Sequence, residues 1–234
     1  RTLIFEKHDN SHGCYFQVKK VLCQYQSKYQ EIMVFETEDH GRVLYIDGQM
    51  MFTSTTRGPY NESMAQIPIH IHKKPSRVLI IGGGDGGVAR ECLSRGFNFV
   101  DWFELDPEVV SVCTKHLSKI GRKVKESNRV KCIWGDAFNS IKSINDSKYD
   151  KIFVDLNDDQ YCINLAAKKM NNLKRILKPG GVITAQIGSH DKKPKQVDNW
   201  LKVLSSNFGN TKLDRIFIPS FDCNWNFASS ILKS

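Results

Sequence analysis

Five acidic residues each follow a short apolar run of the sequence: Asp85, Glu104, Asp136, Asp155 and Asp158. A carboxylate can bind a cation or accept hydrogen bonds from hydroxyl and amino groups. If the apolar runs are parallel strands, their carboxyl ends meet at one edge of a sheet, where ligands of open α/β sheets bind. The pattern therefore predicts an acidic cleft for a cationic ligand, and we expect its affinity to fall as salt rises.

The most specific local motif is the glycine-rich segment after the run Val78–Ile81. Gly82, Gly84 and Gly87 fit the pattern G-x-G-x-x-G, which can hold a dinucleotide but can also be only a tight turn between a strand and a helix. Asp85 lies inside this segment, where a carboxylate would repel a pyrophosphate and attract a cation. We therefore disfavour a nicotinamide-dependent dehydrogenase.

Two further acidic residues complete a nucleoside pattern. Glu104 follows Gly82 by 22 residues, where an acid can hold the two ribose hydroxyls. Asp136 and Ala137 end the next apolar run, where an acceptor can meet an adenine amino group. Together these residues indicate a nucleoside that carries a cation, such as the sulfonium of S-adenosylmethionine or a derivative.

Two parts of the chain, which differ in their pattern of apolar residues, must position these residues. Up to about residue 60, apolar and polar residues alternate between turn signals at Asp39–Gly41 and Asp47–Gly48, which predicts antiparallel hairpins. From Ser76 on, short strands alternate with helices, which predicts an α/β fold with a Rossmann-like doubly wound sheet of the methyltransferase type. Expected strands are Val78–Ile81, Phe99–Glu104, Val130–Trp134, Lys151–Asp155 and Val182–Gln186, and an antiparallel edge is expected from Leu213–Ile218 and Asn226–Leu232.

Helices are expected after Gly87, over Pro107–Ile120, over Ile163–Leu177 and over Gln196–Phe208. Asp106 is expected to cap the helix that begins at Pro107. The chain thus divides into an N-terminal antiparallel domain, residues 1–60, and a Rossmann-like catalytic domain, residues 61–234.

Composition limits the function classes. The chain has 234 residues and a net charge of 34 minus 25, or +9. The basic clusters Lys192–Lys195 and Arg122–Lys125 are interpreted as solvated loops, so we expect no nucleic-acid partner. Apolar runs fall far short of the roughly 20 residues of a membrane helix, and no secretory leader is expected. Seven cysteines without a CxxC pair favour a reducing, cytoplasmic location. His70-Ile71-His72 is expected as a strand or loop without a metal.

Several of these motifs, taken together, resemble the polyamine aminopropyltransferases, the family of spermidine and spermine synthases. The resemblance runs from about Tyr15 to the end of the chain. It is carried by Tyr29–Ile32, Gly41–Gly48, Tyr60 at the head of a helix leading to Pro68, Gly82–Gly87, Glu104–Asp106, Gly135–Ala137 and Asp155–Asp158.

The resemblance implies a reaction. The aminopropyl group of decarboxylated S-adenosylmethionine, a co-substrate, would pass to an amine of a small polyamine, and methylthioadenosine would leave. No metal or prosthetic group is implied. Asp155, assisted by Tyr60, would accept the proton of the attacking amine.

The resemblance also implies binding roles. The donor would be held by Gln30, Gly82, Gly84, Asp85, Glu104, Asp136 and Ala137. The acceptor side would include Tyr60, Asp85, Asp155, Asp158 and Phe221. Tyr60 and Gln30 also have plain structural interpretations, as a half-buried aromatic and an exposed strand residue.

The chain departs from the spermidine synthase pattern on the acceptor side. Met51 and Asn61 stand where glutamines are usual, and Thr56-Arg57 where an acidic pair is usual. Asp155-Leu156 and the tail Pro219–Phe227 look more like spermine synthases. We therefore expect spermidine as the preferred acceptor, giving spermine, with putrescine as the alternative. We expect a homodimer paired through the hairpins, unless the chain is a fragment lacking an N-terminal domain.

Two other function classes stay open. A nucleic-acid methyltransferase would agree with the positive net charge, but it usually carries an Asn/Asp-Pro-Pro-aromatic motif where this chain has Asp155–Asp158, and the acidic cleft would repel phosphates. A non-catalytic relative that only binds the nucleoside would agree with the altered acceptor positions. Turnover with an amine separates both from an aminopropyltransferase.

Overall fold

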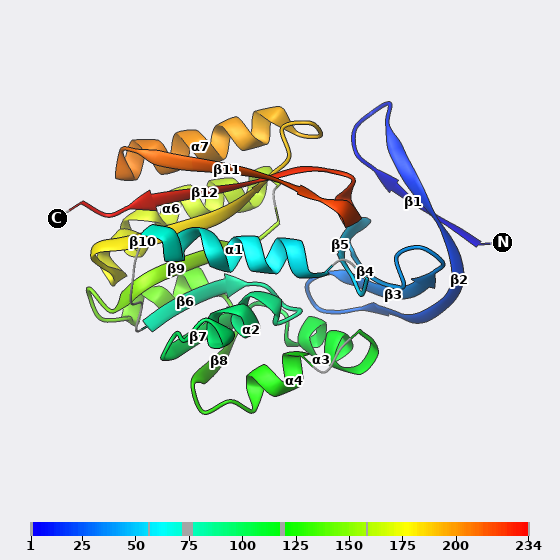
Figure 1. Ribbon diagram of the computed structural model, residues 1–234, viewed down its shortest axis with the longest axis horizontal. Helices are drawn as coiled ribbons and strands as arrows, with labels where there is room; N and C mark the ends of the chain where they lie inside the picture. Colours follow the sequence, from blue (N-terminus) through cyan, green and yellow to red (C-terminus); the bar gives the residue numbers. More distant parts are fainter. Residues whose placement is uncertain (1, 56, 72–76, 118–119, 158, 234) are drawn as a thin grey trace.

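A computed structural model describes residues 2–55, 57–71, 77–117, 120–157 and 159–233. The described chain forms two sheets, which lie side by side in Figure 1. The first is antiparallel and contains β1 (Thr2–Lys7), β2 (Gly13–Gln26), β3 (Glu31–Thr37), β4 (Arg42–Ile46) and β5 (Gln49–Thr53) in sequence order.

Local turn chemistry sets the register of this first sheet. Asp47 and Gly48 have positive φ angles of 47° and 79°, and Ile46 pairs with Gln49 across them. This two-residue turn matches the right-handed twist of a β-hairpin, and Asp-Gly is a pair that adopts it at low cost. The hairpins expected from the alternating sequence are confirmed.

The second sheet has seven strands in the order β11-β12-β10-β9-β6-β7-β8. Five of its strands run parallel to one another. They are β6 (Arg77–Gly82), β7 (Phe99–Glu104), β8 (Val130–Trp134), β9 (Tyr149–Asp155) and β10 (Leu177–Gly188). Strand β12 (Cys223–Ile231) is antiparallel to β10 and to β11 (Thr211–Ile218). The expected Rossmann-like sheet with an antiparallel C-terminal edge is therefore confirmed.

Apolar side chains on both faces of the second sheet explain its runs of consecutive hydrophobic residues. In β6, Val78 and Ile80 pack toward α1 (Arg57–Ile71) and α2 (Gly87–Ser94), whereas Leu79 and Ile81 join the core on the opposite face. Helices α6 (Gln160–Ile176) and α7 (Pro194–Phe208), with the short α5 (Ala137–Ser140), cover that opposite face.

The first sheet is fixed to the second through α3 (Pro107–His116). Its apolar face, which includes Ile32, Val34 and Leu44, packs against Val109 and Val112 of that helix. At the start of α3, Asp106 caps Glu108 N–H at 3.1 Å, as expected, and also accepts a hydrogen bond from Ser27 Oγ at 2.6 Å. This packing holds the first sheet at the carboxyl ends of β6 and β7.

Three sequence expectations about local structure are wrong. The helix from Pro107 ends at His116, and a separate helix α4 (Ile120–Lys125) follows, so the basic cluster 122–125 is helical with Val124 buried. Residues 70 and 71 end α1 instead of forming a strand or loop, because the helix continues for three residues beyond Pro68. Pro68 lacks a backbone donor for the helix, yet the helix continues to Ile71. His72 lies outside the described residues.

Candidate active site

The glycine-rich turn brings β6 and β9 into close contact. Gly82 has a φ of +88°, and a Cβ at this residue would lie 2.1 Å from the carbonyl oxygen of Asp155. A Cβ on Gly84 would lie 2.7 Å from Val109 Cγ1 and 3.1 Å from Glu104 Oε2. Glycine at these two positions lets three carboxylate-bearing segments approach one another.

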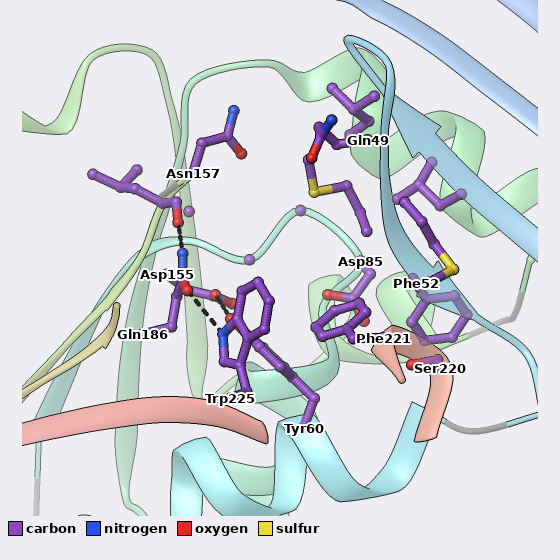
Figure 2. A pocket seen from close by; sticks show the side chains of 18 of the residues that line it. Gln49, Phe52, Tyr60, Asp85, Asp155, Asn157, Gln186, Ser220, Phe221 and Trp225 are labelled. Carbon is purple, nitrogen blue, oxygen red and sulfur yellow. Dashed lines mark hydrogen bonds between the residues drawn. The ribbon is translucent and has the colours of Figure 1, made fainter. Parts of the chain in front are cut away.

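A cavity of about 270 Å³ opens over this turn. It is bounded by the carboxyl ends of the second sheet, by the first sheet and by the tail turn Pro219–Phe221. Figure 2 shows Asp85, Asp155, Tyr60, Phe221 and Trp225 gathered around it. The predicted site residues that line the cavity are Gln30, Tyr60, Gly82, Gly84, Asp85, Glu104, Asp155 and Phe221.

Asp85, Glu104 and Asp155 form the acidic side of the cavity, here called the turn end. Burial raises the pKa of Asp155, its hydrogen bond with Tyr60 opposes this, and the charge of Asp85 adds to the rise, so that the pKa is about 7. Burial raises the pKa of Asp85 to about 6 and that of Glu104 to about 7. Nearby Asp106 and Asp155 add to the effect on Glu104. A bound cation would favour the ionised forms of all three.

Helix α1 presents polar groups to two of these carboxylates. Tyr60 Oη donates a 2.5 Å hydrogen bond to Asp155 Oδ1, and Asn61 Nδ2 donates to Asp85 Oδ2 at 3.5 Å. The Tyr60 ring stacks edge-on against Phe227 and Phe221, with ring centroids 5.4 and 6.0 Å apart. This packing fixes the phenol, so its oxygen holds one orientation of the Asp155 carboxylate.

Gln30 reaches the cavity from the turn between β2 and β3, not from a strand as expected. Its Nε2 donates to Asp106 Oδ2 at 3.0 Å, and the Asp106 backbone N–H donates to Glu104 Oε1 at 3.0 Å. Asp106 therefore links Gln30 to Glu104 and keeps both side chains at the same wall of the cavity. The two residues expected to grip one ribose lie together.

Asp136 and Ala137 are not among the described residues that line the cavity. The Asp136 carboxylate caps α5, accepting hydrogen bonds from Phe138 N–H at 2.8 Å, Asn139 N–H at 3.3 Å and Asn139 Nδ2 at 2.7 Å. Its oxygens are thus engaged by the chain itself. Asp158, the fifth predicted carboxylate, lies outside the described residues.

Gln186 is a polar residue of the cavity that was not predicted from the sequence. Gln186 is buried at the end of β10, where its amide nitrogen donates to the carbonyl oxygen of Leu156 (Figure 2). Its Oε1 accepts from Trp225 Nε1 at 2.9 Å and from Gly188 N–H at 3.1 Å. Gln186 thereby fixes the backbone immediately after Asp155. Gln186 stands at the end of a predicted strand, and this position could have marked it as a residue of the site.

The other side of the cavity, here called the hairpin end, consists of Glu6, His8 and Lys192. Glu6 Oε1 lies 3.2 Å from His8 Nε2, and Glu6 Oε2 accepts the Met50 backbone N–H at 2.9 Å. Lys192 Nζ lies 3.4 Å from His8 Nε2. The expectation that residues 192–195 form a solvated loop is wrong, because Lys192 and Lys193 line the cavity and α7 begins at Pro194.

In the part of the chain that the structure describes, every helix is too short or too polar to cross a lipid bilayer.

Comparisons with known proteins agree with this geometry. Residues 2–54 match the family described as "Spermidine synthase tetramerisation domain", and residues 58–233 match "Spermine/spermidine synthase domain". A polyamine aminopropyltransferase of Prochlorococcus marinus (strain MIT 9215) is 33% identical over 217 residues, which cover 90% of this chain and 77% of that protein. One from Thermoplasma volcanium is 30% identical and covers 95% of this chain and 82% of its own.

Solved structures give the same result. The chain superposes on a spermidine synthase in complex with the transition-state analogue AdoDATO with a TM-score of 0.91 and 25% identity, covering 98% of this chain and 80% of that one. Spermidine synthase from Thermotoga maritima gives a TM-score of 0.90 at 25% identity, covering 99% and 79%.

Proposed function

Because the chain belongs to the spermine/spermidine synthase family and is a transferase of that family, we propose that it moves the aminopropyl group of decarboxylated S-adenosylmethionine to a polyamine amine. Methylthioadenosine would be the second product. The observation that supports this most is the Tyr60–Asp155 pair beside Asp85 and Glu104 in one cavity. A clustered set of carboxylates suits one cationic donor and one amine that must lose a proton.

In the reaction, the neutral amine nitrogen of the acceptor attacks the methylene carbon next to the sulfonium. The new C–N bond forms as the C–S bond breaks, and the bonding pair stays on sulfur, which becomes a neutral thioether. Asp155 accepts the proton that the nitrogen releases. Its pKa of about 7 suits a base at neutral pH, and Tyr60 orients it. Holding nitrogen, carbon and sulfur in line supplies much of the rate gain.

The other predicted site residues bind the donor and the far end of the acceptor. Asp85 faces the ammonium of the aminopropyl arm, and Gln30 and Glu104 hold the ribose hydroxyls above Gly82 and Gly84. Asp136 and Ala137 contact the adenine, which requires that the ligand approach the outer edge of the cavity beside α5. Asp158 faces a distant ammonium of the acceptor. Each reaction step is carried by these side chains without a metal or prosthetic group.

We propose spermidine as the preferred acceptor, which makes spermine the product. The aromatic wall of Phe221 and Trp225, whose ring centroids are 4.6 Å apart, gives an apolar surface for the methylene chain of a long amine. Glu6 at the hairpin end offers a further carboxylate to a long acceptor.

An amine panel tests the proposal. The purified chain is incubated with decarboxylated S-adenosylmethionine and putrescine, cadaverine, spermidine or spermine, and methylthioadenosine release is measured, with ordinary S-adenosylmethionine as the control donor. Release with spermidine at the highest kcat/KM is expected. Preference for putrescine would overturn the acceptor assignment. Methylthioadenosine binding without release with any amine would overturn catalysis and indicate a nucleoside-binding relative.

We further propose that the chain acts in the cytoplasm as a homodimer, with residues 1–60 as the pairing domain and 61–234 as the catalytic domain. Exposed apolar side chains on β1 and β2 support this, since Phe5 and Tyr15 are 71% and 62% exposed and their rings lie tilted against each other. Such a patch is typical of a protein interface. Light scattering during size exclusion should give a dimer mass, and a tetramer or monomer would contradict it.

A further inference from the structure

The first hairpin carries three metal-ligating side chains on one face. Glu6 and Cys14 are direct partners across β1 and β2, and His8 follows the end of β1 directly, with its Nε2 within 3.6 Å of both side chains. Cross-strand partners share a face of the sheet, and the chain continues past β1 in a direction that keeps His8 beside them. The pairing of the hairpin therefore directs a carboxylate, an imidazole and a thiol to one point.

The distances between these groups suit a tetrahedral ion. Glu6 Oε1 lies 3.2 Å and Cys14 Sγ 3.6 Å from His8 Nε2, and all three ligand atoms lie within 4.8 Å of one another. Ligand bonds of 2.0–2.3 Å to zinc place oxygen and nitrogen roughly 3.3 Å apart, and nitrogen and sulfur roughly 3.6 Å apart. The two shortest pairs already stand near this spacing.

The surroundings of the three groups are also those of a metal site. Glu6 is 6% exposed, and its second oxygen accepts the Met50 N–H at 2.9 Å, which fixes the carboxylate as outer-shell hydrogen bonds do for metal ligands. Hydrogen bonds also fix the turn between β1 and β2. The Asp9 carboxylate accepts the backbone N–H groups of Ser11 and His12 at 2.7 and 2.8 Å.

In the absence of an ion, the positive charge beside these three side chains comes from Lys192. Its ammonium donates to His8 Nε2, the atom that a metal would need, at 3.4 Å. A lysine side chain is long and flexible, so it can withdraw when a cation of higher charge arrives. Lys192 is therefore a competitor of the metal.

We propose that Glu6, His8 and Cys14 form a binding site for zinc or a zinc-like divalent ion, with Lys192 as its built-in competitor. Three protein ligands leave the fourth position open, and Glu6 and His8 line the cavity, so this position faces the cavity. A bound ion adds positive charge at the hairpin end. If the chain is an aminopropyltransferase, as proposed above, the ion therefore competes with a cationic acceptor.

Cobalt(II) reports the site directly, because a thiolate ligand gives cobalt a charge-transfer absorption band. The full chain, free of substrates, is titrated with cobalt chloride and then with zinc chloride. A stoichiometric band that zinc abolishes is expected. Cys14→Ser should remove the thiolate band, whereas the control Cys132→Ser, on the distant strand β8, should keep it. Absence of the band, or its persistence in Cys14→Ser, overturns the site.

Two variants keep the test independent of folding defects. His8→Gln should weaken cobalt binding by at least about tenfold, since it removes one of three ligands. Lys192→Met, which keeps the stem and removes the charge, should instead tighten binding by about tenfold. A disrupted hairpin cannot produce this gain. Unchanged affinity in Lys192→Met overturns the competition.

The consequence for catalysis is measured separately. Zinc should raise the apparent KM of the amine acceptor in the unchanged chain and have a much smaller effect in Cys14→Ser. Zinc binding without this difference overturns the inhibitory role and leaves the site in place. Failure of every amine in the panel would count against the proposed function, whereas cobalt binding needs no substrate.

Discussion

The carboxylates at the two ends of the cavity have different neighbours. At the turn end, Asp85, Glu104 and Asp155 lie close enough that neighbouring carboxylates raise the pKa of Glu104 and Asp155. At the hairpin end, Glu6 has a histidine 3.2 Å away, and a lysine contacts that histidine. At the turn end, a cationic substrate would therefore stabilise the ionised carboxylates. At the hairpin end, the chain itself supplies a cation, the ammonium of Lys192.

This difference follows from what each region is built on. The turn end stands on a glycine-rich turn and on buried parallel strands, whose spacing is fixed by the core of the larger sheet. The hairpin end stands on β1, the edge strand of the smaller sheet, and on the segment before α7. We infer that binding energy for the reacting groups is concentrated at the turn end, and that the hairpin end tunes which acceptors enter.

The largest effect is expected for Asp155→Asn. The amide cannot accept the amine proton, so kcat should fall by on the order of a thousandfold. The dissociation constant of methylthioadenosine, measured by calorimetry, should stay within a few-fold, since the donor nucleoside does not depend on that proton. Unchanged turnover would remove Asp155 from the mechanism. Tyr60→Phe, which loses only the orienting hydroxyl, should cost less.

Glu104→Gln should mainly weaken donor binding. The amide keeps the shape but loses the charge that strengthens hydrogen bonds to hydroxyl groups, so the KM for the donor should rise by on the order of tenfold. The KM for the acceptor should change much less, which steady-state kinetics with each substrate varied in turn will show. A defect confined to kcat would contradict the ribose role.

Lys192→Met tests the hairpin end, and a smaller effect is expected. Removing the ammonium leaves Glu6 more available to a cationic amine, so the KM for spermidine should fall by about two- to fivefold at low salt. The gain should shrink as salt rises. An increased KM would indicate that Lys192 assists acceptor binding, and the two ends would then act alike.

The smallest expected effect is on stability. The raised pKa values of Asp85, Glu104 and Asp155 mean that the folded chain holds more protons than the unfolded chain between about pH 4 and pH 7. Their contribution to stability is therefore fully present below about pH 4 and is lost as pH rises through about 6 to 7. Without ligand, Asp155→Asn should lose less Tm than the unchanged chain between pH 5 and pH 8. An equal loss would contradict the shifted pKa.

Much of the turn end could be predicted from the sequence. Gly82, Asp85, Glu104 and Asp155 are each tied to a strand end a few residues away, and strand ends are readable from short apolar runs and turn residues. Because β6 pairs in parallel with both β7 and β9, the carboxylates that follow these strands come together at one edge of the sheet. Asp106 as a helix cap was predictable for the same reason, because capping involves only neighbouring residues.

Some features could not be decided from the sequence, because local alternatives compete. Asp136 sits at a strand end like the others, yet its carboxylate caps α5, and nothing in the run of residue types decides between a cap and a ligand contact. Likewise, Lys192 and Lys193 have the composition of a solvated loop. They line the cavity because the segment between β10 and α7 passes over the site.

The sequence by itself determined the strand and helix alternation, the glycine turn and the carboxylates that follow the strands, since each depends on neighbours in the chain. Only the tertiary structure decided that Glu6, His8 and Cys14 converge, that Gln186 joins Trp225 to the backbone after Asp155, and that the smaller sheet closes the cavity. These contacts depend on strand register and on packing between distant segments. Periodicity shows which face a side chain occupies, but it does not show what lies opposite.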